Sequence, residues 1–408
     1  MHFSTATVIA ALPFLVAALP SPAPKNGIAV DLAKRSGSRR ADGTVDPAKL
    51  KANIKASVAK IQRGLANYER NTGNTHPLAK SFKSTQKRDT GADPLTDVSA
   101  ELWYGTISVG TPSTDYTVDF DTGSSDLFLP GSDCGSTCSG HTLYDPSSSS
   151  TSEDVGKDFS LQYGDGSTVS GEQYTDTVTI AGLTADKQTL GAAKQYSSGF
   201  ESSQFPADGL MGMGFKSISD YNADPVFQTL VSSGAVTDSV FGFKLSDSGA
   251  ELYLGGTNDD LVGGDFTYVP VTQEGYWQVD MDGFSVGGSQ AVSSTSAIID
   301  TGTTLIVGDS QSVASAYESI SGAQDNGDGT YTVDCDLDTD ISITFGGQDF
   351  TISPSTFALD AGNGQCIGGL SYEDSIASEF WIVGDVFLQN VYTAFDVGKS
   401  QVGFATLS

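Results

Sequence analysis

Two copies of one acidic triplet are the residues of this chain best suited to chemistry. Asp121-Thr122-Gly123 and Asp300-Thr301-Gly302 lie 179 residues apart, and each follows an apolar run. Each is followed by hydroxyl-bearing residues, Ser124-Ser125 in the first copy and Thr303-Thr304 in the second. The repetition indicates two related halves that present one carboxylate each. Such a pair can activate a water molecule without a metal ion or a protein nucleophile.

The neighbours of each aspartate have expected roles of their own. Gly123 and Gly302 permit a tight turn that exposes the aspartate at the end of its strand. Ser124 and Thr303 are placed to hydrogen-bond the outer carboxylate oxygens. For any single serine or threonine a turn cap is the ordinary interpretation. The occurrence of these residues at equivalent places in both halves favours a function.

The two halves share a second motif. In the first half, Leu210-Met211-Gly212 ends 91 residues after Asp121. In the second half, Ile382-Val383-Gly384 ends 84 residues after Asp300. Each half therefore contains an apolar strand, an Asp-Thr-Gly triplet and an apolar-apolar-Gly motif at a similar spacing. This order fits a duplication.

The elements that must position these motifs are mostly strands. Short β-rich or alternating runs follow one another from residue 89 onwards and are separated by turn signals, which predicts an all-β body with little helix. The clearest runs are Trp103–Val109, Tyr116–Phe120, Thr175–Ile180, Val240–Leu245, Leu252–Leu254, Gly275–Met281 and Ile341–Phe345. Two short helical windows stand out, Pro225–Val231 and Asp309–Ile320.

Charge divides the chain sharply at the dibasic pair Lys87-Arg88. Between Pro24 and Arg88 there are 15 basic and 4 acidic residues, whereas the remaining body has 6 lysines and 46 acidic residues. Residues 1–20 have the apolar core of a signal peptide. We therefore expect residues 21–88 to be a basic propeptide, with a helical pattern from Pro47 to Tyr68. A solvated tail or a nucleic-acid arm is the alternative interpretation of the basic segment.

The acidic body excludes some functions. It lacks the cations that phosphate binding requires, so we expect no nucleic-acid partner. Its carboxylates repel one another when all are ionised, which favours a protein that works in acid. Beyond the signal region no apolar stretch is long enough to span a membrane. We expect a secreted protein without a membrane segment, with delivery to a vacuole as the alternative.

The four cysteines all lie in the body. An even number in a secreted chain predicts disulfides, and the most economical of the three connectivities is Cys134–Cys138 with Cys335–Cys366. A zinc site is the rival interpretation, but His141 is the only histidine of the body and the cysteine spacing is not that of a zinc motif. We expect no metal and no organic cofactor.

Together these motifs resemble the pepsin-like aspartic endopeptidases, particularly the secreted fungal enzymes. Six strings carry the resemblance in order over residues 89–408: DFDTGSSDLFLP, LQYGDGSTVSG, ADGLMGMGF, GYWQV, AIIDTGTTL and FWIVGDVFLQNVYTAFD. The resemblance implies a bilobal fold of two related β-barrel-like lobes, here residues 89–270 and 271–408, with a cleft between them. It also implies a monomer that hydrolyses peptide bonds at acid pH, preferring large hydrophobic residues around the cleaved bond.

The resemblance assigns further residues. Thr122 and Thr301 would bond across to the opposite loop and tie the halves together. Tyr163-Gly164-Asp165 looks like the mobile flap that closes over bound substrate, although an ordinary hairpin turn is the plainer interpretation. Asp165 occupies a position at which many fungal relatives carry aspartate and accept lysine before the cleaved bond. Phe128 departs from the family, which usually has a tryptophan there whose ring N–H reaches the flap tyrosine; phenylalanine has no donor.

The basic propeptide would then be an intramolecular inhibitor that blocks the cleft until acid releases it. Lys80 and Lys83 are the candidates for a lysine that approaches the two aspartates. Two other functions use similar parts. A glycosidase also works with two carboxylates but needs no matched triplets or flap. A catalytically silent homologue would bind peptides or glycans, and the intact triplets in both halves argue against it.

Overall fold

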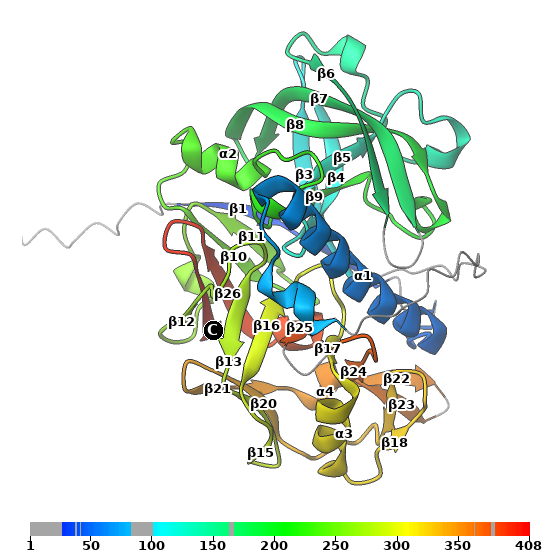
Figure 1. Ribbon diagram of the computed structural model, residues 1–408, viewed down its shortest axis with the longest axis vertical. Helices are drawn as coiled ribbons and strands as arrows, with labels where there is room; N and C mark the ends of the chain where they lie inside the picture. Colours follow the sequence, from blue (N-terminus) through cyan, green and yellow to red (C-terminus); the bar gives the residue numbers. More distant parts are fainter. Residues whose placement is uncertain are drawn as a thin grey trace, which may run out of the picture.

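The computed structural model describes residues 27–36, 39–40, 42–82, 101–162, 167–362, 364–376 and 380–408. Strands dominate, and they form one lobe at the top and one at the bottom of Figure 1. The helix α1 (Pro47–Thr72) lies between the lobes. The expected all-β, bilobal fold is confirmed. The signal region 1–20, the Lys87-Arg88 pair and the flap residues Tyr163, Gly164 and Asp165 lie outside the described residues.

An eight-stranded sheet makes up the first lobe, in the order β2-β3-β4-β9-β5-β8-β7-β6. Its strands are β2 (Ala33–Ser36), β3 (Glu101–Val109), β4 (Thr114–Asp121), β5 (Leu127–Pro130), β6 (Glu153–Gln162), β7 (Thr168–Ile180), β8 (Leu183–Tyr196) and β9 (Gly209–Gly212). Buried and partly exposed residues alternate along most of β7, as expected for a strand with one face on a core. Strand β2 comes from the expected propeptide and pairs with β3.

A six-stranded sheet joins the two halves, in the order β1-β11-β10-β26-β27-β12. Its strands are β1 (Ile28–Asp31), β10 (Val240–Lys244), β11 (Glu251–Leu254), β12 (Thr267–Pro270), β26 (Val391–Asp396) and β27 (Gln401–Thr406). Strands β10 and β26 pair antiparallel from Val240 with Asp396 to Lys244 with Tyr392. The edge strand β1 belongs to the expected propeptide, so this sheet contains strands from all three parts of the chain.

Three sheets build the second lobe. They have the orders β13-β16-β25-β17-β24, β15-β14-β20-β21 and β18-β19-β23-β22. Their strands are β13 (Gln278–Met281), β14 (Gly283–Val286), β15 (Ser289–Val292), β16 (Thr295–Ile299), β17 (Ile306–Gly308), β18 (Gln324–Asp325), β19 (Tyr331–Val333), β20 (Ile341–Phe345), β21 (Gln348–Ile352), β22 (Ala358–Gly362), β23 (Gln365–Gly368), β24 (Leu370–Tyr372) and β25 (Phe380–Val383).

The internal repeat is visible in the strand pairings around the two triplets. In the first lobe β4 pairs parallel with β9, β9 antiparallel with β5, and β5 parallel with β8. In the second lobe β16 pairs parallel with β25, β25 antiparallel with β17, and β17 parallel with β24. The same sequence of pairings, with a triplet after the first strand each time, supports the duplication inferred from the motifs.

Helices are few and short apart from α1. They are α2 (Val226–Ser232), α3 (Ser310–Glu318), α4 (Pro354–Phe357), α5 (Asp385–Leu388) and the 3-10 turns η1 (Pro77–Ser81), η2 (Gly135–Cys138), η3 (Pro146–Ser148), η4 (Ser198–Phe200), η5 (Lys216–Ile218) and η6 (Asp259–Leu261). Helix α1 begins behind Asp46, whose side chain accepts a hydrogen bond from the Ala48 N–H, and ends at Gly73 in the left-handed conformation. Both ends therefore follow ordinary capping rules.

The apolar face of α1 is the one predicted from its spacing. Leu50, Ile54, Val58, Ile61 and Leu65 are all buried. They recur every three or four residues and so form one stripe along the helix. The stripe packs into the same hydrophobic core as the two lobes. The helix is therefore an integral part of the folded chain in this form.

One predicted strand is shorter than expected. The run Gly275–Met281 becomes a strand only from Gln278, because the two aromatic residues before it make contacts outside the sheet. Tyr276 donates its hydroxyl to the carbonyl of Ile61 at 2.7 Å, and Trp277 donates its ring N–H to the carbonyl of Met213 at 3.0 Å. These bonds hold the segment as a loop between α1 and the first lobe.

Candidate active site

The two aspartates lie at the ends of equivalent strands. Asp121 is the last residue of β4 and Asp300 directly follows β16. Both side chains are buried. Main-chain bonds to the second motif of each half fix their positions: the Met213 N–H donates to the Asp121 carbonyl at 2.8 Å, and the Asp300 N–H donates to the Val383 carbonyl at 3.1 Å. The motifs identified from spacing thus hold the aspartates in place.

The two threonines link the triplets reciprocally. The Thr122 N–H donates to Oγ1 of Thr301 at 3.1 Å, and the Thr301 N–H donates to Oγ1 of Thr122 at 3.0 Å. Each hydroxyl then donates to a carbonyl of the opposite half, Thr122 to Ile299 at 2.9 Å and Thr301 to Phe120 at 2.7 Å. Four buried hydrogen bonds therefore connect the two halves at this point. The role that the resemblance implied for Thr122 and Thr301 has this geometry.

Each carboxylate accepts two hydrogen bonds from its own triplet and the residue after it. Asp121 accepts from the Gly123 N–H at 2.9 Å through Oδ1 and from the Ser124 hydroxyl at 2.5 Å through Oδ2. Asp300 accepts from the Gly302 N–H at 3.0 Å and from the Thr303 hydroxyl at 2.6 Å in the same pattern. Ser124 and Thr303 thus hold the outer oxygens, and the inner oxygens are left to face each other.

Gly123 and Gly302 lie in the turns expected directly after the two aspartates, and neither has a left-handed φ angle. The close approach of the opposite carboxylate is a further reason for a glycine at each position. A Cβ atom built on Gly123 would lie 2.5 Å from Oδ1 of Asp300, and one on Gly302 would clash with Oδ1 of Asp121. The glycines therefore give each carboxylate room to approach the opposite loop. Any side chain at either position would push the two carboxylates apart.

A lysine of helix α1 lies between the two carboxylates. Lys60 Nζ is 2.8 Å from Oδ1 of Asp121 and 2.9 Å from Oδ1 of Asp300. The ammonium group is buried with them. The expected candidates were Lys80 and Lys83. The first of these is exposed on η1, away from the aspartates, and the second lies outside the described residues.

Lys60 could have been found from the helical pattern alone. It directly precedes the buried Ile61 and comes three residues after the buried Ser57. A lysine on the buried face of an amphipathic helix requires an acidic partner, because an unpaired buried charge is costly. The position of a basic residue on the helix face was the better signal.

Electrostatics divides the roles of the two aspartates in this form. Burial acts to raise the pKa of Asp121, but the charge and hydrogen bond of Lys60 outweigh it, so its pKa is lowered. Burial and the neighbouring Asp121 charge raise the pKa of Asp300 in spite of Lys60. Burial opposes the charged form of Lys60, yet the two carboxylates raise its pKa. In mild acid Asp300 therefore takes up a proton first, and Asp121 keeps its charge opposite Lys60.

Further contacts fix α1 on both sides of Lys60. On the side of the second lobe, the hydroxyl oxygens of Thr303 and Ser57 are within hydrogen-bond distance, 2.9 Å apart. On the side of the first lobe, the Asn67 amide donates to the Ile218 carbonyl at 3.0 Å. Away from the helix, the expected propeptide pairs with the body through Lys34 and Asp247 at 2.7 Å. Basic residues of the propeptide therefore do meet acidic residues of the body, as the charge distribution predicted.

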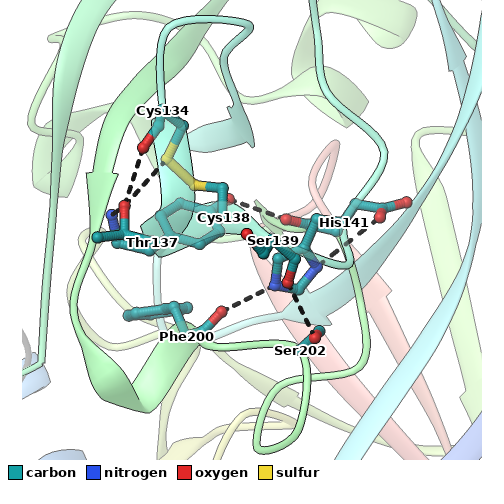
Figure 2. Close-up of a disulfide and its surroundings, with 9 residues drawn as sticks. Cys134, Thr137, Cys138, Ser139, His141, Phe200 and Ser202 are labelled. Carbon is teal, nitrogen blue, oxygen red and sulfur yellow. Dashed lines mark hydrogen bonds and ion pairs between the residues drawn. A yellow bond between two sulfur atoms is a disulfide. The ribbon is translucent and has the colours of Figure 1, made fainter.

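Phe128, the residue that departs from the resemblance, lies in a buried aromatic cluster. Its ring meets those of Tyr196 and Phe200 edge-on, at centroid distances of 5.9 and 5.6 Å. Figure 2 shows how the neighbouring disulfide loop is tied to this cluster: His141 Nε2 lies 2.9 Å from the carbonyl oxygen of Phe200. Phenylalanine at this position is thus packed by other aromatic rings.

The structure contains both expected disulfides, Cys134–Cys138 and Cys335–Cys366. The first closes the loop drawn in Figure 2 and the second joins a loop after β19 to β23. Within the residues that the structure describes, no group of histidine, cysteine, aspartate and glutamate side chains could hold a metal ion. None of the described helices is long and apolar enough to cross a membrane.

Comparison with known proteins agrees with this geometry. Residues 102–407 match the family model of eukaryotic aspartyl proteases. An aspartic protease of Phaffia rhodozyma is 43% identical over 332 residues, which are 78% of this chain and 80% of the relative. Rhizopuspepsin-2 of Rhizopus niveus is 37% identical over 358 residues, covering 85% and 88% of the two chains. Pepsin A of Sus scrofa is 36% identical over 329 residues, covering 78% and 84%.

Proposed function

Because this chain belongs to the eukaryotic aspartyl protease family and is an aspartic endopeptidase acting on peptide substrates, we propose that Asp121 and Asp300 are its catalytic dyad. The reciprocal bonding of the two triplets is the observation that carries the proposal. It ties the two triplets together, and each buried carboxylate accepts an equivalent pair of hydrogen bonds within its own half. Ionising both carboxyl groups of so close a pair is unfavourable, because their negative charges repel each other. One proton is therefore shared between them, as is known for aspartic protease dyads.

Peptide hydrolysis follows from this shared proton. The ionised carboxylate takes a proton from a water molecule as the water attacks the scissile carbonyl carbon. The protonated carboxyl donates to the carbonyl oxygen, on which negative charge develops. The proton taken from the water is then passed to the nitrogen of the leaving amine, and the dyad returns to its starting state. Ser124 and Thr303 keep both outer oxygens fixed during the exchange, and Thr122 and Thr301 keep the two loops at one separation.

The second part of the proposal is that the chain is made as a zymogen. Lys60 supports it, because an ammonium group between Asp121 and Asp300 occupies the place of the attacking water. The helix that carries Lys60 also fills the space that an extended peptide would need. Acid removes charge from the carboxylates and weakens the attraction of the basic propeptide for the body, so release is pH-driven and salt-sensitive. Cleavage at Lys87-Arg88 then separates propeptide and enzyme.

The proposed substrates are proteins and peptides with large hydrophobic residues around the cleaved bond. They bind extended, mostly through main-chain hydrogen bonds. We assign Tyr163, Gly164 and Asp165 to a flap that closes over the substrate and excludes water. Asp165 would accept lysine before the cleaved bond. An Asp165→Thr variant should lose most cleavage after lysine and keep cleavage after phenylalanine or leucine; equal losses on both would refute the assignment.

The proposed place of action is outside the cell or in a vacuole, in either case at acid pH. The net charge of −29 for the whole chain supports work in acid, where fewer carboxylates repel one another. Detection of the protein, shortened by its first 88 residues, in the culture medium or in isolated vacuoles would decide between the two sites.

Digestion of a mixed peptide library by the acid-treated protein tests the activity itself. We expect cleavage at acid pH that pepstatin abolishes, with large apolar residues on both sides of the cut. The full chain before acid treatment is the matched control and should be inactive. An acid-treated, folded protein that cleaves nothing in a pepstatin-sensitive way would overturn the proposal.

A further inference from the structure

An arginine of α1 marks a second charged contact inside the cleft. Arg63 follows Lys60 by three residues, and its guanidinium lies between two acceptors of the first lobe. Its Nε is 3.3 Å from Oδ2 of Asp220, and its Nη1 donates to the carbonyl of Gln162 at 2.7 Å. A second arginine, Arg70, approaches Oδ1 of the same aspartate at 3.8 Å. Two cations of the propeptide thus converge on one carboxylate of the body.

The body holds this carboxylate in place from below. The Asp220 N–H donates to Oδ2 of Asp126 at 2.8 Å, and the Ser219 hydroxyl donates to Oδ1 of Asp126 at 2.6 Å. Asp126 is buried, and burial together with the nearby Asp220 charge raises its pKa to about 6. Below that pH Asp126 is protonated, so the neighbour that repels a charge on Asp220 is neutral.

Both acceptors remain when the propeptide leaves. Asp220 follows η5, and Gln162 is the last residue of β6, immediately before the proposed flap segment. The Asp220 side chain is only 14% exposed while α1 covers it. Departure of the helix removes Arg63 and Arg70 together and leaves a carboxylate and a carbonyl oxygen open to whatever next enters the cleft.

The distance of the Arg63 contact from the two aspartates follows from the geometry of α1, on which Arg63 comes three residues after Lys60. Three residues of α-helix advance about 4.5 Å. An extended peptide advances about 3.3 Å per residue. A substrate side chain that reaches the place of Arg63 therefore belongs to a residue within about three positions of the scissile bond. The contact is close enough to the reacting carbonyl to act on substrate selection.

We propose that Asp220, with the Gln162 carbonyl, forms a subsite that binds a cationic side chain of the substrate, arginine in preference to lysine. The inference rests on the proposed function and names a substrate class for it. Arginine is preferred because its planar guanidinium can pair with the carboxylate and donate to the carbonyl at once, whereas lysine offers a single charged nitrogen. The propeptide uses the same subsite as a docking point before activation.

Wild-type enzyme tests the subsite first, so that the result does not depend on the folding of a variant. The full chain is expressed, converted in acid, and assayed at pH 5 on peptides of one sequence that carry arginine, citrulline or lysine at each of the three positions on either side of the cut. Citrulline has nearly the shape of arginine without its charge. At one position the arginine peptide should be cleaved with a kcat/KM about three- to tenfold above the citrulline peptide, mainly through KM, as for a partly exposed charge pair. Added salt should reduce that ratio.

Asp220→Asn then identifies the residue. The variant should cleave the arginine and citrulline peptides with equal kcat/KM, so that the ratio between the two peptides falls to about one. Asp224→Asn is the matched control, since Asp224 is a nearby aspartate of the same lobe that pairs with Lys216 at 3.1 Å. This control should keep the preference.

Three outcomes are possible. Equal cleavage of arginine and citrulline peptides at all positions by active wild-type enzyme would overturn the subsite. So would a preference that survives in the Asp220→Asn variant. Failure of the proposed function is distinguishable from both, since no peptide of the series would then be cleaved at all.

Discussion

His76 provides the sharpest prediction about how acid opens the cleft. It lies in the proposed propeptide, between α1 and η1, and is fully buried. Its ring meets Tyr68 and Tyr276 edge-on, at centroid distances of 4.8 and 6.2 Å, and Nδ1 accepts the Leu78 N–H at 3.2 Å. Among the residues that the structure describes, none is a hydrogen-bond partner of the other ring nitrogen, Nε2. It faces the backbone of Gly275, where an added Cβ would lie 3.1 Å away.

Burial without a partner lowers the pKa of His76 from 6.5 to about 4. The ionisable groups against it are the phenols of Tyr68 and Tyr276, and neither offers a negative charge in acid. The docked form therefore binds this proton less well than the released form. Its stability is intact above pH 6.5, falls as the pH drops, and has lost the full contribution below about pH 4. From these two pKa values docking should weaken about 4-fold at pH 6, 30-fold at pH 5 and 160-fold at pH 4.

Two substitutions remove the titration while keeping different parts of the contact. His76→Phe keeps a ring against Tyr68 and Tyr276, and His76→Asn keeps an acceptor for the Leu78 N–H. Both should convert to the mature enzyme more slowly than wild type, by about 30-fold at pH 5, if conversion follows release. Conversion is measured on gels between pH 4 and 7, and variant-to-wild-type ratios cancel the pH dependence of the dyad.

Lys80→Gln is the control, because it changes a charge on the same segment at an exposed side chain. It should follow the wild-type profile. If both His76 variants convert at the wild-type rate at every pH, then His76 is not a proton sensor and the reasoning is refuted. A uniform slowing or acceleration, without dependence on pH, would equally contradict it.

Three further predictions concern the Lys60 ion pairs, the disulfides and the charge of the body. Lys60→Met should leave the propeptide loosely docked and allow conversion at higher pH, because breaking a buried ion pair costs about 3–5 kcal/mol. Conversion is followed at pH 6, where the control Lys55→Met, at an exposed position of α1, should behave like wild type. Replacing Cys335 and Cys366 by serine should lower the free energy of unfolding, measured in urea, by about 4 kcal/mol. Replacing Cys134 and Cys138 should lower it by only about 2 kcal/mol, because that disulfide closes a loop of 4 residues and the other a loop of 31. Equal losses would contradict the chain-entropy argument. The mature enzyme should lose thermal stability from pH 4.5 to 7.5 more than the zymogen does, and salt should reduce the loss; a mature enzyme most stable at neutral pH would refute this.

Much of the site was readable from the sequence because it is built from local motifs. A triplet at the end of an apolar strand fixes where the aspartate lies, and its repetition predicted that two such strands meet. The bonds from Ser124 and Thr303 to the outer oxygens follow from a spacing of three residues. Helix α1 was predicted from its apolar spacing over Pro47–Tyr68, and it extends four residues further, to Thr72, before the cap at Gly73 ends it.

What the sequence did not reveal depends on contacts between distant segments. The pairing of β10 with β26 joins residues about 150 positions apart, and no local pattern specifies such a partner. The aromatic run at Tyr276 and Trp277 has strand propensity, but its hydrogen bonds to Ile61 and Met213 override that propensity. A side chain at Gly123 is excluded by Asp300, so this requirement for glycine becomes visible only when the opposite loop is in place. The partners of Lys60 also belong to distant segments, although its place on the buried face of α1 was a local signal for the residue itself.

The account rests centrally on Asp121 and Asp300 acting together on one water molecule. The most direct test is kcat for peptide cleavage at acid pH by Asp121→Asn and Asp300→Asn, each freed of its propeptide by a protease that cuts after Lys87-Arg88 and checked for an unchanged melting temperature. Asparagine keeps the hydrogen bonds to Ser124 or Thr303 but cannot take or give the proton. Each variant should lose at least about a thousandfold in kcat, within the range that proton transfer by a positioned side chain contributes. A folded variant of either aspartate that keeps a tenth of the wild-type kcat would contradict the account.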